Sequence, residues 1–321
     1  MKGSSRDPGE AHAQITAVVL TWNNFSDTRD CIESLLALEP RAPRLVVVDN
    51  ASTDGSAGLL QRAYASTSGI QFVFNSRNLG FASGVNVGIR IALEQGCDYV
   101  LLLNNDAIIG GGAVRLLQKA AENDPSVGIA GPRILYHSDD RRIWHGGGYF
   151  SGVRMGVVVP EKDRLAERCG TEIREARFLT GCAMLIKREV FETVGLFDED
   201  FFLYEEDLDF CLRAARAGYR LVYEPAALVW HKISPAGGDR TSPTVIYHRA
   251  RSRILMLRKN FTRIRCMYGL LLHVFVYTPV RFLQISRGTR ALASARAWLG
   301  GTWAGVRFPT SVSVGTKEAA R

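Results

Sequence analysis

The chain has 321 residues, 46% of them hydrophobic, and a net charge of +8 at neutral pH. This length can bury one large core or a core with an appendage. Its six cysteines are scattered and include no C-x-x-C pair, so the sequence argues against a disulfide framework and a zinc site and favours a reducing cytoplasm. Residues 1–14 are polar and lack the apolar stretch of a secretion signal, which predicts a short disordered leader.

Positive charge is concentrated in the last part of the chain. Residues 232–321 contain 16 Lys or Arg against Asp239 and Glu318, a net charge of +14, so the preceding part carries 8 − 14 = −6. This asymmetry indicates that one end meets an anionic surface, either nucleic acid or lipid. No basic motif with regularly interleaved aromatic residues occurs there, so we expect an anionic membrane surface and no nucleic acid.

Apolar runs alternate with segments of helical spacing in the first part of the chain. The runs are ITAVVLT, RLVVVD, IQFVF and DYVLLL, and each is rich in β-branched residues or leucine, as strands are. Strands that alternate with helices favour a parallel α/β sheet covered on both faces, which binds ligands beyond the carboxyl ends of its strands.

Polar clusters follow three of these strands: TWNN after the first, DNASTDG after the second and NNDA after the fourth. Each cluster taken singly is ordinary turn or helix-cap material. Three at one sheet edge predict a shared binding crevice. A dinucleotide-binding domain would need a glycine-rich turn after the first strand, and TWNNFSD has no glycine.

Several ordered motifs resemble the family-2 glycosyltransferases of the GT-A fold, especially their rhamnosyltransferase-like branch. They are VVLTWNN, VVVDNASTDGS, NLGFASGVNVGI, LLLNNDA, FLTGCAMLIKREVFETVGLFDEDFFLYEEDLDFCLRAARAGYRLVYEP and VWH, and they cover about residues 15–258. The resemblance implies an α/β fold with a Rossmann-like, mostly parallel sheet flanked by helices. It also implies an inverting glycosyltransferase that moves a sugar, with rhamnose as the first candidate, from a dTDP- or UDP-sugar to a hydroxyl of a glycan or polyprenyl-linked acceptor in cell-envelope polysaccharide synthesis.

The resemblance places the nucleotide-sugar donor at the strand ends. The implied donor-binding residues are Thr21, Trp22, Asn23, Asp49, Asn50, Asp54, Asn78, Gly80, Asn86, Asn104 and Asn105. An aromatic face at Trp22 can stack on a base, and a carboxylate can accept hydrogen bonds from a base or ribose. Trp22 could instead be a core aromatic residue, and the segment from Asn78 to Asn86 could be a capped turn with a close-packed glycine.

The carboxylate of Asp106 matches the family's metal motif, and His231 matches a histidine that completes the metal shell in some relatives. Mg²⁺ or Mn²⁺ suits such a site, because these ions take oxygen ligands from one or two carboxylates, phosphate and water. Asn104 stands where the broader family often has the first aspartate of D-x-D. A structural histidine is the alternative role for His231.

Four carboxylates, Glu205, Glu206, Asp207 and Asp209, crowd the start of a helix predicted to run to about Ala217. Favourable interaction with the helix dipole explains one or two of them, but the crowding raises pKa values in a way that is typical of functional sites. By resemblance, Asp207 is the general base, and Glu206 is a second catalytic residue that also binds the acceptor. Gly181 is expected in the acceptor pocket, or in a tight turn before the next strand.

The basic C-terminal part reads as helices. Pro279 and Arg281 interrupt its apolar run, so we expect it to be too short to span a bilayer and to lie in an anionic membrane interface; a helical subdomain packed on the core is the alternative.

The predicted divisions are a leader at 1–14, a GT-A domain at 15–243 with a nucleotide-sugar half at about 15–110 and an acceptor half at about 111–243, a basic helical region at 244–308 and a disordered tail at 309–321.

Two other functions are compatible with parts of this pattern. One is a non-catalytic, membrane-associated sugar-nucleotide-binding protein. The other is a nucleotidyltransferase, which would need a glycine-rich basic phosphate loop after the first strand. The glycosyltransferase prediction carries a cytoplasmic location, peripheral at the inner face of the plasma membrane.

Overall fold

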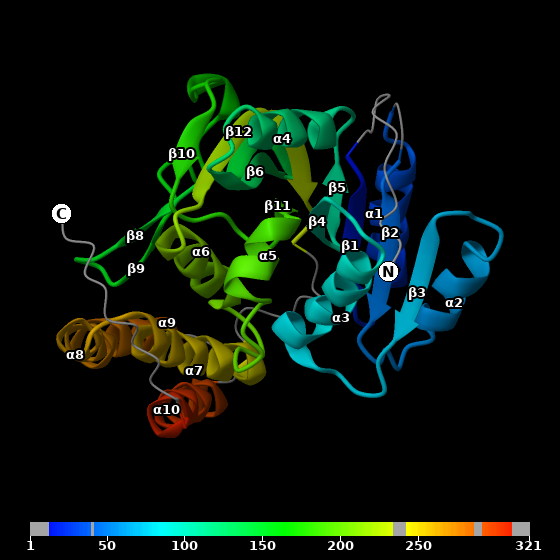
Figure 1. The fold of residues 1–321 in the computed structure, drawn as a ribbon. Coiled ribbons are helices and arrows are strands. Elements are labelled where there is room, and N and C mark those ends of the chain that lie inside the picture. The colour runs from blue at the N-terminus through cyan, green and yellow to red at the C-terminus, as the bar shows by residue number, and fades with distance from the viewer. Residues whose placement is uncertain (1–12, 40–41, 234–241, 286–290, 310–321) are drawn as a thin grey trace, which may run out of the picture.

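The computed structural model describes residues 13–39, 42–233, 242–285 and 291–309, so most of the predicted leader and all but one residue of the predicted tail lie outside the described residues. The first half alternates strands and helices as the sequence predicts (Figure 1). In chain order its elements are β1 (Ile15–Thr21), α1 (Phe25–Leu36), β2 (Arg44–Asp49), α2 (Ser56–Ala63), β3 (Ile70–Phe74), α3 (Gly80–Glu94) and β4 (Tyr99–Asn104).

The second half adds strands that run in both directions. Its elements are β5 (Ala107–Ile109), α4 (Ala113–Glu122), β6 (Val127–Tyr136), β7 (Asp139–His145), β8 (Tyr149–Ser151), β9 (Gly156–Val158), η1 (Ala166–Arg168), β10 (Arg174–Ala176), β11 (Ala183–Lys187), α5 (Arg188–Val194), α6 (Glu206–Arg216) and β12 (Arg220–His231). The α6 helix ends one residue before Ala217, which confirms the predicted end.

One large sheet organises the molecule, in the strand order β10-β12-β6-β11-β4-β1-β2-β3. The strands β3, β2, β1 and β4 are parallel neighbours, as predicted. The strand β11 lies antiparallel between β4 and β6 and joins the two halves, while β12 runs parallel to β6. This arrangement confirms the predicted α/β class with a Rossmann-like sheet.

Helices cover both faces of the sheet because successive side chains of each strand point to opposite faces. Along β1, Val18 packs with Val85 and Ile89 of α3 in one core, and Ala17 and Val19 pack with the helices α1 and α4 in the other. All of these side chains are fully buried. The continuous apolar runs of the sequence are therefore strands buried on both faces.

The C-terminal part forms a helical layer below α6 in Figure 1. Its elements are α7 (Pro243–Asn260), α8 (Arg263–Leu272), the π-helical turn η3 (His273–Tyr277), α9 (Thr278–Ile285) and α10 (Ala291–Arg307). The helix α7 contributes Leu255, Met256 and Leu257 to the core that α3 and α6 share. The first helix of the basic region is therefore packed on the core of the α/β domain.

The segment from α8 to α9 differs from the prediction, because Pro279 does not end the helix. The π-helical turn lies immediately before Pro279, and the wider turn accommodates a residue that lacks an amide N–H. Residues Arg263–Gln284 thus form a helix that is long and apolar enough to cross a membrane by length and composition alone, and only 11% of its most apolar window is buried. The prediction that this run is too short was wrong.

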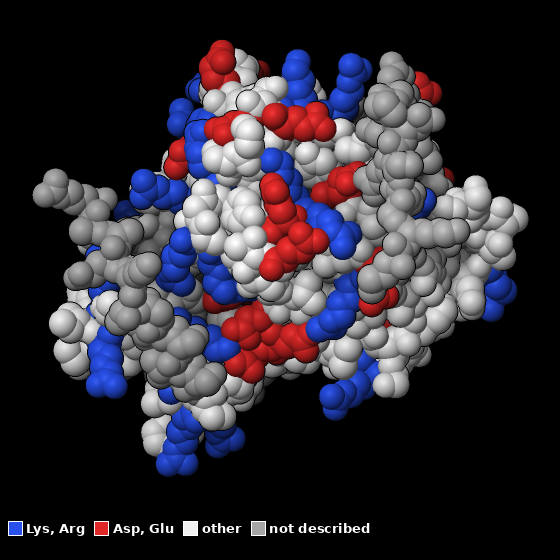
Figure 2. Space-filling model, in the orientation of Figure 1, with Lys and Arg blue, Asp and Glu red and all other residues white. Residues whose placement is uncertain are grey.

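Large apolar side chains on this layer face outward, with Ile264, Phe275 and Leu283 each about 70% exposed. Figure 2 shows basic side chains projecting from the helical layer at the lower left, whereas acidic side chains gather above it. The layer therefore combines an uncovered apolar surface with positive charge.

Gly80 is a sensitive position of the fold because it has a φ of +81° and a Cβ there would lie 2.3 Å from the Phe202 carbonyl oxygen. We expect Gly80→Ala to lower the free energy of unfolding by about 2–4 kcal/mol. Gly55 has a similar φ of +84° but open space around it, so Gly55→Ala should cost only about 1 kcal/mol. Urea unfolding of both variants measures the difference, and equal costs would contradict the close approach.

Candidate active site

The three polar clusters lie at one edge of the sheet. Strand pairing sets Thr21 beside Asp49 and Leu20 beside Asn104, so β2, β1 and β4 end at adjacent positions. This register confirms that the strand ends share one edge. It also places Asp106, two residues beyond β4, at the same edge.

Asp49 and Trp22 present groups that a ligand could use. Asp49 is buried, and its Oδ2 accepts a hydrogen bond of 3.0 Å from the Ser52 amide, while its buried Oδ1 has no partner among the described residues. Trp22 is 44% exposed, which is not the packing of a core aromatic residue. One acceptor and one aromatic face therefore lie at adjacent strand ends, because Thr21, which precedes Trp22, pairs with Asp49.

Asn50 is the centre of a hydrogen-bond network below this edge. Its Nδ2 donates to Asn78 Oδ1 and to the Gly80 carbonyl, both at 3.0 Å, and its Oδ1 accepts from Asn75 Nδ2 and the Leu79 amide. Every polar atom of its amide is used within the chain. Asn50 therefore shapes the loop before α3, and any donor contact by Asn50, Asn78 or Gly80 stays a prediction.

Asn23, Thr21 and Asn105 brace the loops against one another. Asn23 Oδ1 accepts from the Thr53 amide at 2.7 Å, which ties the loop after β1 to the loop after β2. Asn105 Nδ2 donates to Thr28 Oγ1 at 2.9 Å, and Thr28 Oγ1 also lies 2.7 Å from Thr21 Oγ1. These contacts fix the loops at this edge of the sheet, whether or not the same residues also bind the nucleotide-sugar donor.

Asp54 and Asn86 also have partners within the chain. Asp54 Oδ1 accepts from the amide and hydroxyl of Ser56 at the start of α2, and this lowers the pKa of Asp54. Asn86 is fully buried and bonds the amide and carbonyl of Phe197. It holds α3 to the segment between α5 and α6.

Asp106 and His231 come together through the pairing of β12 with β5, which sets His231 opposite Ala107. Asp106 Oδ1 lies 3.1 Å from His231 Nε2, and both side chains are buried. The sequence predicted these two residues as metal ligands, and the structure places them in contact. Among the described residues, no group of three or more His, Cys, Asp or Glu gathers around a common point.

The surroundings of His231 favour a positive charge. Burial lowers the pKa of His231, but the neighbouring Cys182 sulfur and Asp106 carboxylate outweigh that effect and raise the pKa to about 10. Trp144 packs edge-on against the ring at 4.4 Å. A buried site that holds a proton between a carboxylate and an imidazole could hold a divalent cation in its place.

Asp207 lies at the first turn of α6, where the chain is strained. Tyr204 and Glu205 both have left-handed φ values, of 70° and 69°, a conformation that is costly for residues other than glycine and is typical of functional sites. Asp207 Oδ2 accepts a hydrogen bond of 3.1 Å from the Gly181 amide, and its Oδ1 accepts from the Leu208 amide. Burial raises the pKa of Asp207 while these donors oppose the rise.

Glu206 is buried, and its Oε2 has no partner in the part of the chain that the structure describes. Burial, reinforced by the Asp207 charge, raises the pKa of Glu206 well above its ordinary value. Native proteins seldom leave buried polar atoms unpaired. Predicted site residues hold such atoms at four places: Asp49 Oδ1, Asn104 Oδ1, Glu206 Oε2 and His231 Nδ1.

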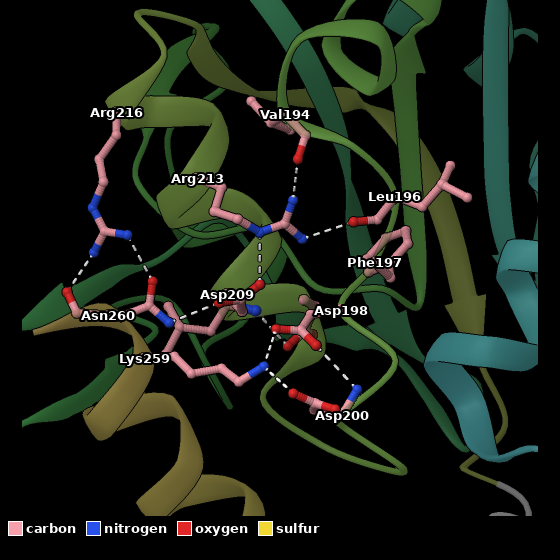
Figure 3. Close-up of polar contacts among 12 residues, drawn as sticks. Val194, Leu196, Phe197, Asp198, Asp200, Asp209, Arg213, Arg216, Lys259 and Asn260 are labelled. Atoms are coloured by element: carbon pink, nitrogen blue, oxygen red, sulfur yellow. Dashed lines mark hydrogen bonds and ion pairs between the residues drawn. The ribbon is translucent and has the colours of Figure 1, made fainter. Parts of the chain in front are cut away.

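Figure 3 shows the contacts that hold α6 in place. Arg213 donates to Asp209 at 2.8 Å and to the carbonyls of Val194 and Leu196, and Asn260 of α7 donates to the other oxygen of Asp209 at 2.7 Å. Asp209 is thus a structural carboxylate that anchors α6 to α7. Glu206 and Asp207, by contrast, form an acidic pair that no Lys or Arg of the described segments bridges.

A cavity of about 500 Å³ lies elsewhere, between the β8–β9 hairpin and β10, and is lined by Gly148, Arg164, Arg174 and Arg177 among others. None of the predicted site residues lines it. Arg174 is committed to Glu161 at 2.7 Å. The candidate site built from the predicted residues therefore does not include this cavity.

The fold is that of the GT-A glycosyltransferases. GalNAc-T7, solved with UDP, GalNAc and Mn²⁺, superposes with a TM-score of 0.59 at 18% identity over 76% of this chain and 48% of its own. The mannosyltransferase PcManGT from Pyrobaculum calidifontis, solved with GDP-Man and Mn²⁺, superposes with a TM-score of 0.58 at 17% identity over 95% of this chain and 91% of its own.

Residues 16–195 match the sequence profile of the family described as Glycosyl transferase family 2, and the chain belongs to that family. It is similar to the N-acetylglucosaminyl-diphospho-decaprenol L-rhamnosyltransferase of Mycobacterium tuberculosis, with 28% identity over 74% of this chain and 82% of the relative. It is also similar to the dTDP-rhamnosyl transferase RfbF of Shigella flexneri, with 26% identity over 78% of this chain and 81% of the relative. The protein is a glycosyltransferase, as the motifs predicted.

Three neighbours of the site carried no sequence signal of their own. Cys182 and Trp144 adjoin His231 only because the sheet brings them there. Lys232 bridges Asp27 and Asp30 of α1 at 3.1 and 2.6 Å and so fixes the end of β12. Cys182 and Trp144 are distant from His231 in the chain, so only the order of the strands in the sheet brings them together.

Glu206 makes stability depend on pH. Its pKa is higher in the folded chain than the ordinary 4.5 of the unfolded chain, so the folded state keeps a proton that the unfolded state releases, and stability falls as the pH rises above that value. Glu206→Gln removes this loss. Its melting temperature relative to the original chain should rise more at pH 8 than at pH 5, and the exposed-site control Glu172→Gln should show no such trend; a parallel shift at both pH values would contradict the burial argument.

Proposed function

We propose that this chain is a metal-dependent, inverting glycosyltransferase whose general base is Asp207. The observation that most directly supports this proposal is the arrangement of Asp207, which accepts hydrogen bonds from the Gly181 and Leu208 amides and lies beside the buried Glu206. Burial raises the pKa of Asp207 and so makes the carboxylate more basic, while the two amide donors stabilise its ionised form, a balance that suits a general base.

In the proposed reaction Asp207 accepts the proton of an acceptor hydroxyl as that oxygen attacks the anomeric carbon of the donor sugar. The attack comes from the face opposite the nucleoside diphosphate, so the configuration inverts. Burial raises the pKa of Glu206 well above its ordinary value, and in its protonated form Glu206 can donate a hydrogen bond to an acceptor oxygen. Gly181 helps to position Asp207 through its amide, which donates a hydrogen bond of 3.1 Å to Asp207 Oδ2.

Asp106 and His231 fit a resident Mg²⁺ or Mn²⁺. The supporting observations are their contact and the buried Oδ1 of Asn104, two residues before Asp106, which lacks a partner in the described segments. When bound, such an ion neutralises charge on the departing diphosphate. The two solved GT-A structures named above contain Mn²⁺.

The relatives support the choice of donor and acceptor. One is named for dTDP-rhamnose transfer and another for transfer of L-rhamnose to a diphospho-decaprenol-linked sugar. We therefore infer a dTDP- or UDP-sugar donor, rhamnose as the first sugar to test, and a hydroxyl of a glycan or polyprenyl-linked acceptor in cell-envelope polysaccharide synthesis. Trp22 and Asp49 would face the nucleoside.

The helical layer supports attachment to the inner face of the plasma membrane. Its α8–α9 surface is apolar and exposed, and the region around it is basic, a combination that suits an anionic bilayer interface. Nucleic acid is not an expected partner.

A non-catalytic sugar-nucleotide binder is the second candidate. It would need the sheet edge but not the acidic pair at the start of α6. The cost of burying Glu206 beside Asp207, with no cation bridging the two among the described residues, therefore favours the enzyme.

We expect Asp207→Asn to lower kcat about a thousandfold, since a general base contributes on that order, while binding of UDP or dTDP is unchanged. Asp106→Ala should instead weaken Mn²⁺-dependent nucleotide binding roughly tenfold to a hundredfold. Calorimetric titration with both nucleotides, with and without Mn²⁺, and a transfer assay measure the two effects. Normal turnover by Asp207→Asn would refute the base, and metal-independent binding would refute the Asp106 site.

Membrane attachment predicts that the chain sediments with vesicles containing phosphatidylglycerol and less with phosphatidylcholine vesicles or at high salt. Leu271 and Phe275, which are 50% and 71% exposed, are suitable probes. The double variant Leu271→Asp and Phe275→Asp should bind at least about tenfold more weakly, because each side chain loses its apolar burial. Ile173→Asp, at an exposed site near β10, is the control, and equal binding by the double variant would contradict the interface.

A further inference from the structure

Two arginines of α7 adjoin the segment that carries the catalytic acids. Arg249 lies with its guanidinium 4.6 Å from the Tyr204 ring centroid, and Tyr204 precedes Asp207 by three residues. Arg253, one turn further along α7, lies 4.2 Å from the Tyr277 ring of η3. Each guanidinium lies over an aromatic ring, a contact that helps to fix the group and leaves N–H donors for hydrogen bonds.

The hydrogen-bonding capacity of these arginines is largely unused. No hydrogen bond or ion pair to the Arg249 side chain occurs among residues 13–39, 42–233, 242–285 and 291–309. Arg253 donates through Nη2 to the Met155 carbonyl at 2.8 Å, but its buried Nε has no partner in the same ranges. Buried or half-buried donors without acceptors indicate a ligand that supplies them.

A third arginine, Arg281 of α9, approaches the same place. Burial and the neighbouring Arg249 charge lower the pKa of Arg281. Glu205 is the nearby acid, and burial raises the pKa of Glu205 to about 7 although Arg253 and Arg249 act to lower it. Glu205 supplies at most one negative charge beside the guanidiniums of Arg249 and Arg253, so the cluster favours an anion.

The position of the cluster selects the kind of anion. Arg281 and Tyr277 belong to the exposed apolar helix Arg263–Gln284, while Tyr204 leads directly to Glu206 and Asp207. The cluster thus lies between an apolar surface and the acidic pair, in the helical layer below α6 (Figure 1). A ligand with a lipid tail, a phosphate group and a sugar would span these three parts in that order.

We propose that Arg249, Arg253 and Arg281 form a binding site for the diphosphate of a lipid-linked acceptor, separate from the donor diphosphate at Asp106. This proposal rests on the proposed glycosyltransferase function. It assigns to α7 and α9 the task of holding the acceptor so that its sugar hydroxyl reaches Asp207. Guanidinium groups suit this ligand because their paired N–H donors match phosphate oxygens.

Binding of farnesyl diphosphate and farnesol to the full chain tests the site without any need for turnover. The titrations are made in detergent with EDTA, so that a metal-dependent donor site does not contribute. The chain should bind the diphosphate more tightly than the alcohol, and Arg249→Gln should lose that preference by about tenfold, the effect expected for one charge-assisted hydrogen bond. Arg281→Gln should act in the same direction.

Arg265→Gln is the matched control, because Arg265 is an exposed arginine near the start of α8 and its loss removes the same charge from the helical layer. It should leave the preference unchanged. The proposal is overturned if Arg249→Gln binds farnesyl diphosphate as tightly as the original chain, or if the chain does not distinguish the diphosphate from the alcohol.

Phosphatidylglycerol micelles form the second arm of the experiment. If Arg249→Gln weakens binding of this lipid as much as binding of farnesyl diphosphate, the arginines serve bilayer headgroups and the acceptor site is overturned. Failure of the proposed function shows separately, as an absence of sugar transfer by a chain that still binds the prenyl diphosphate through Arg249.

Discussion

The pairing of β12 with β5 and β6 is the constraint on which the site depends. It carries His231 from the far half of the chain to within 3.1 Å of Asp106, and Lys232 then fixes that end of β12 against α1. The antiparallel β11 makes this possible, because it joins the nucleotide half of the sheet to the half that contains β12.

The acidic pair at the start of α6 shows how an unfavourable arrangement is kept. Burial of Glu206 and repulsion between Glu206 and Asp207 both cost free energy. The preceding residues Tyr204 and Glu205 also adopt a left-handed backbone conformation. The anchors are remote from the carboxylates themselves: Arg213 and Asn260 hold Asp209, and Lys259 bridges Asp198 and Asp200 (Figure 3). Stability contributed by these contacts offsets the cost of the site.

The helical layer connects the site to the region that we propose meets the membrane. Its helix α7 belongs to the core on one side and carries Arg249 and Arg253 on another. The π-helical turn keeps α8 and α9 continuous through Pro279, so one long apolar surface adjoins the arginines. A single helical layer could therefore position both the protein on a bilayer and a lipid-linked acceptor at Asp207.

The sequence by itself determined the α/β class, the strand ends that form the site and the extent of α6, because buried strands and helix starts leave local patterns of apolar, polar and acidic residues. Local pattern also suggested that Asn50, Asn78 and Asn86 bind the donor, but whether an amide faces a ligand or braces a loop depends on partners distant in the chain. Pro279 was misjudged for a related reason, since a π-helical turn has no simple sequence signature. Only the tertiary structure could bring Cys182 and Trp144 to His231 and Arg249 to Tyr204, because these contacts follow from strand order and helix packing and not from spacing along the chain.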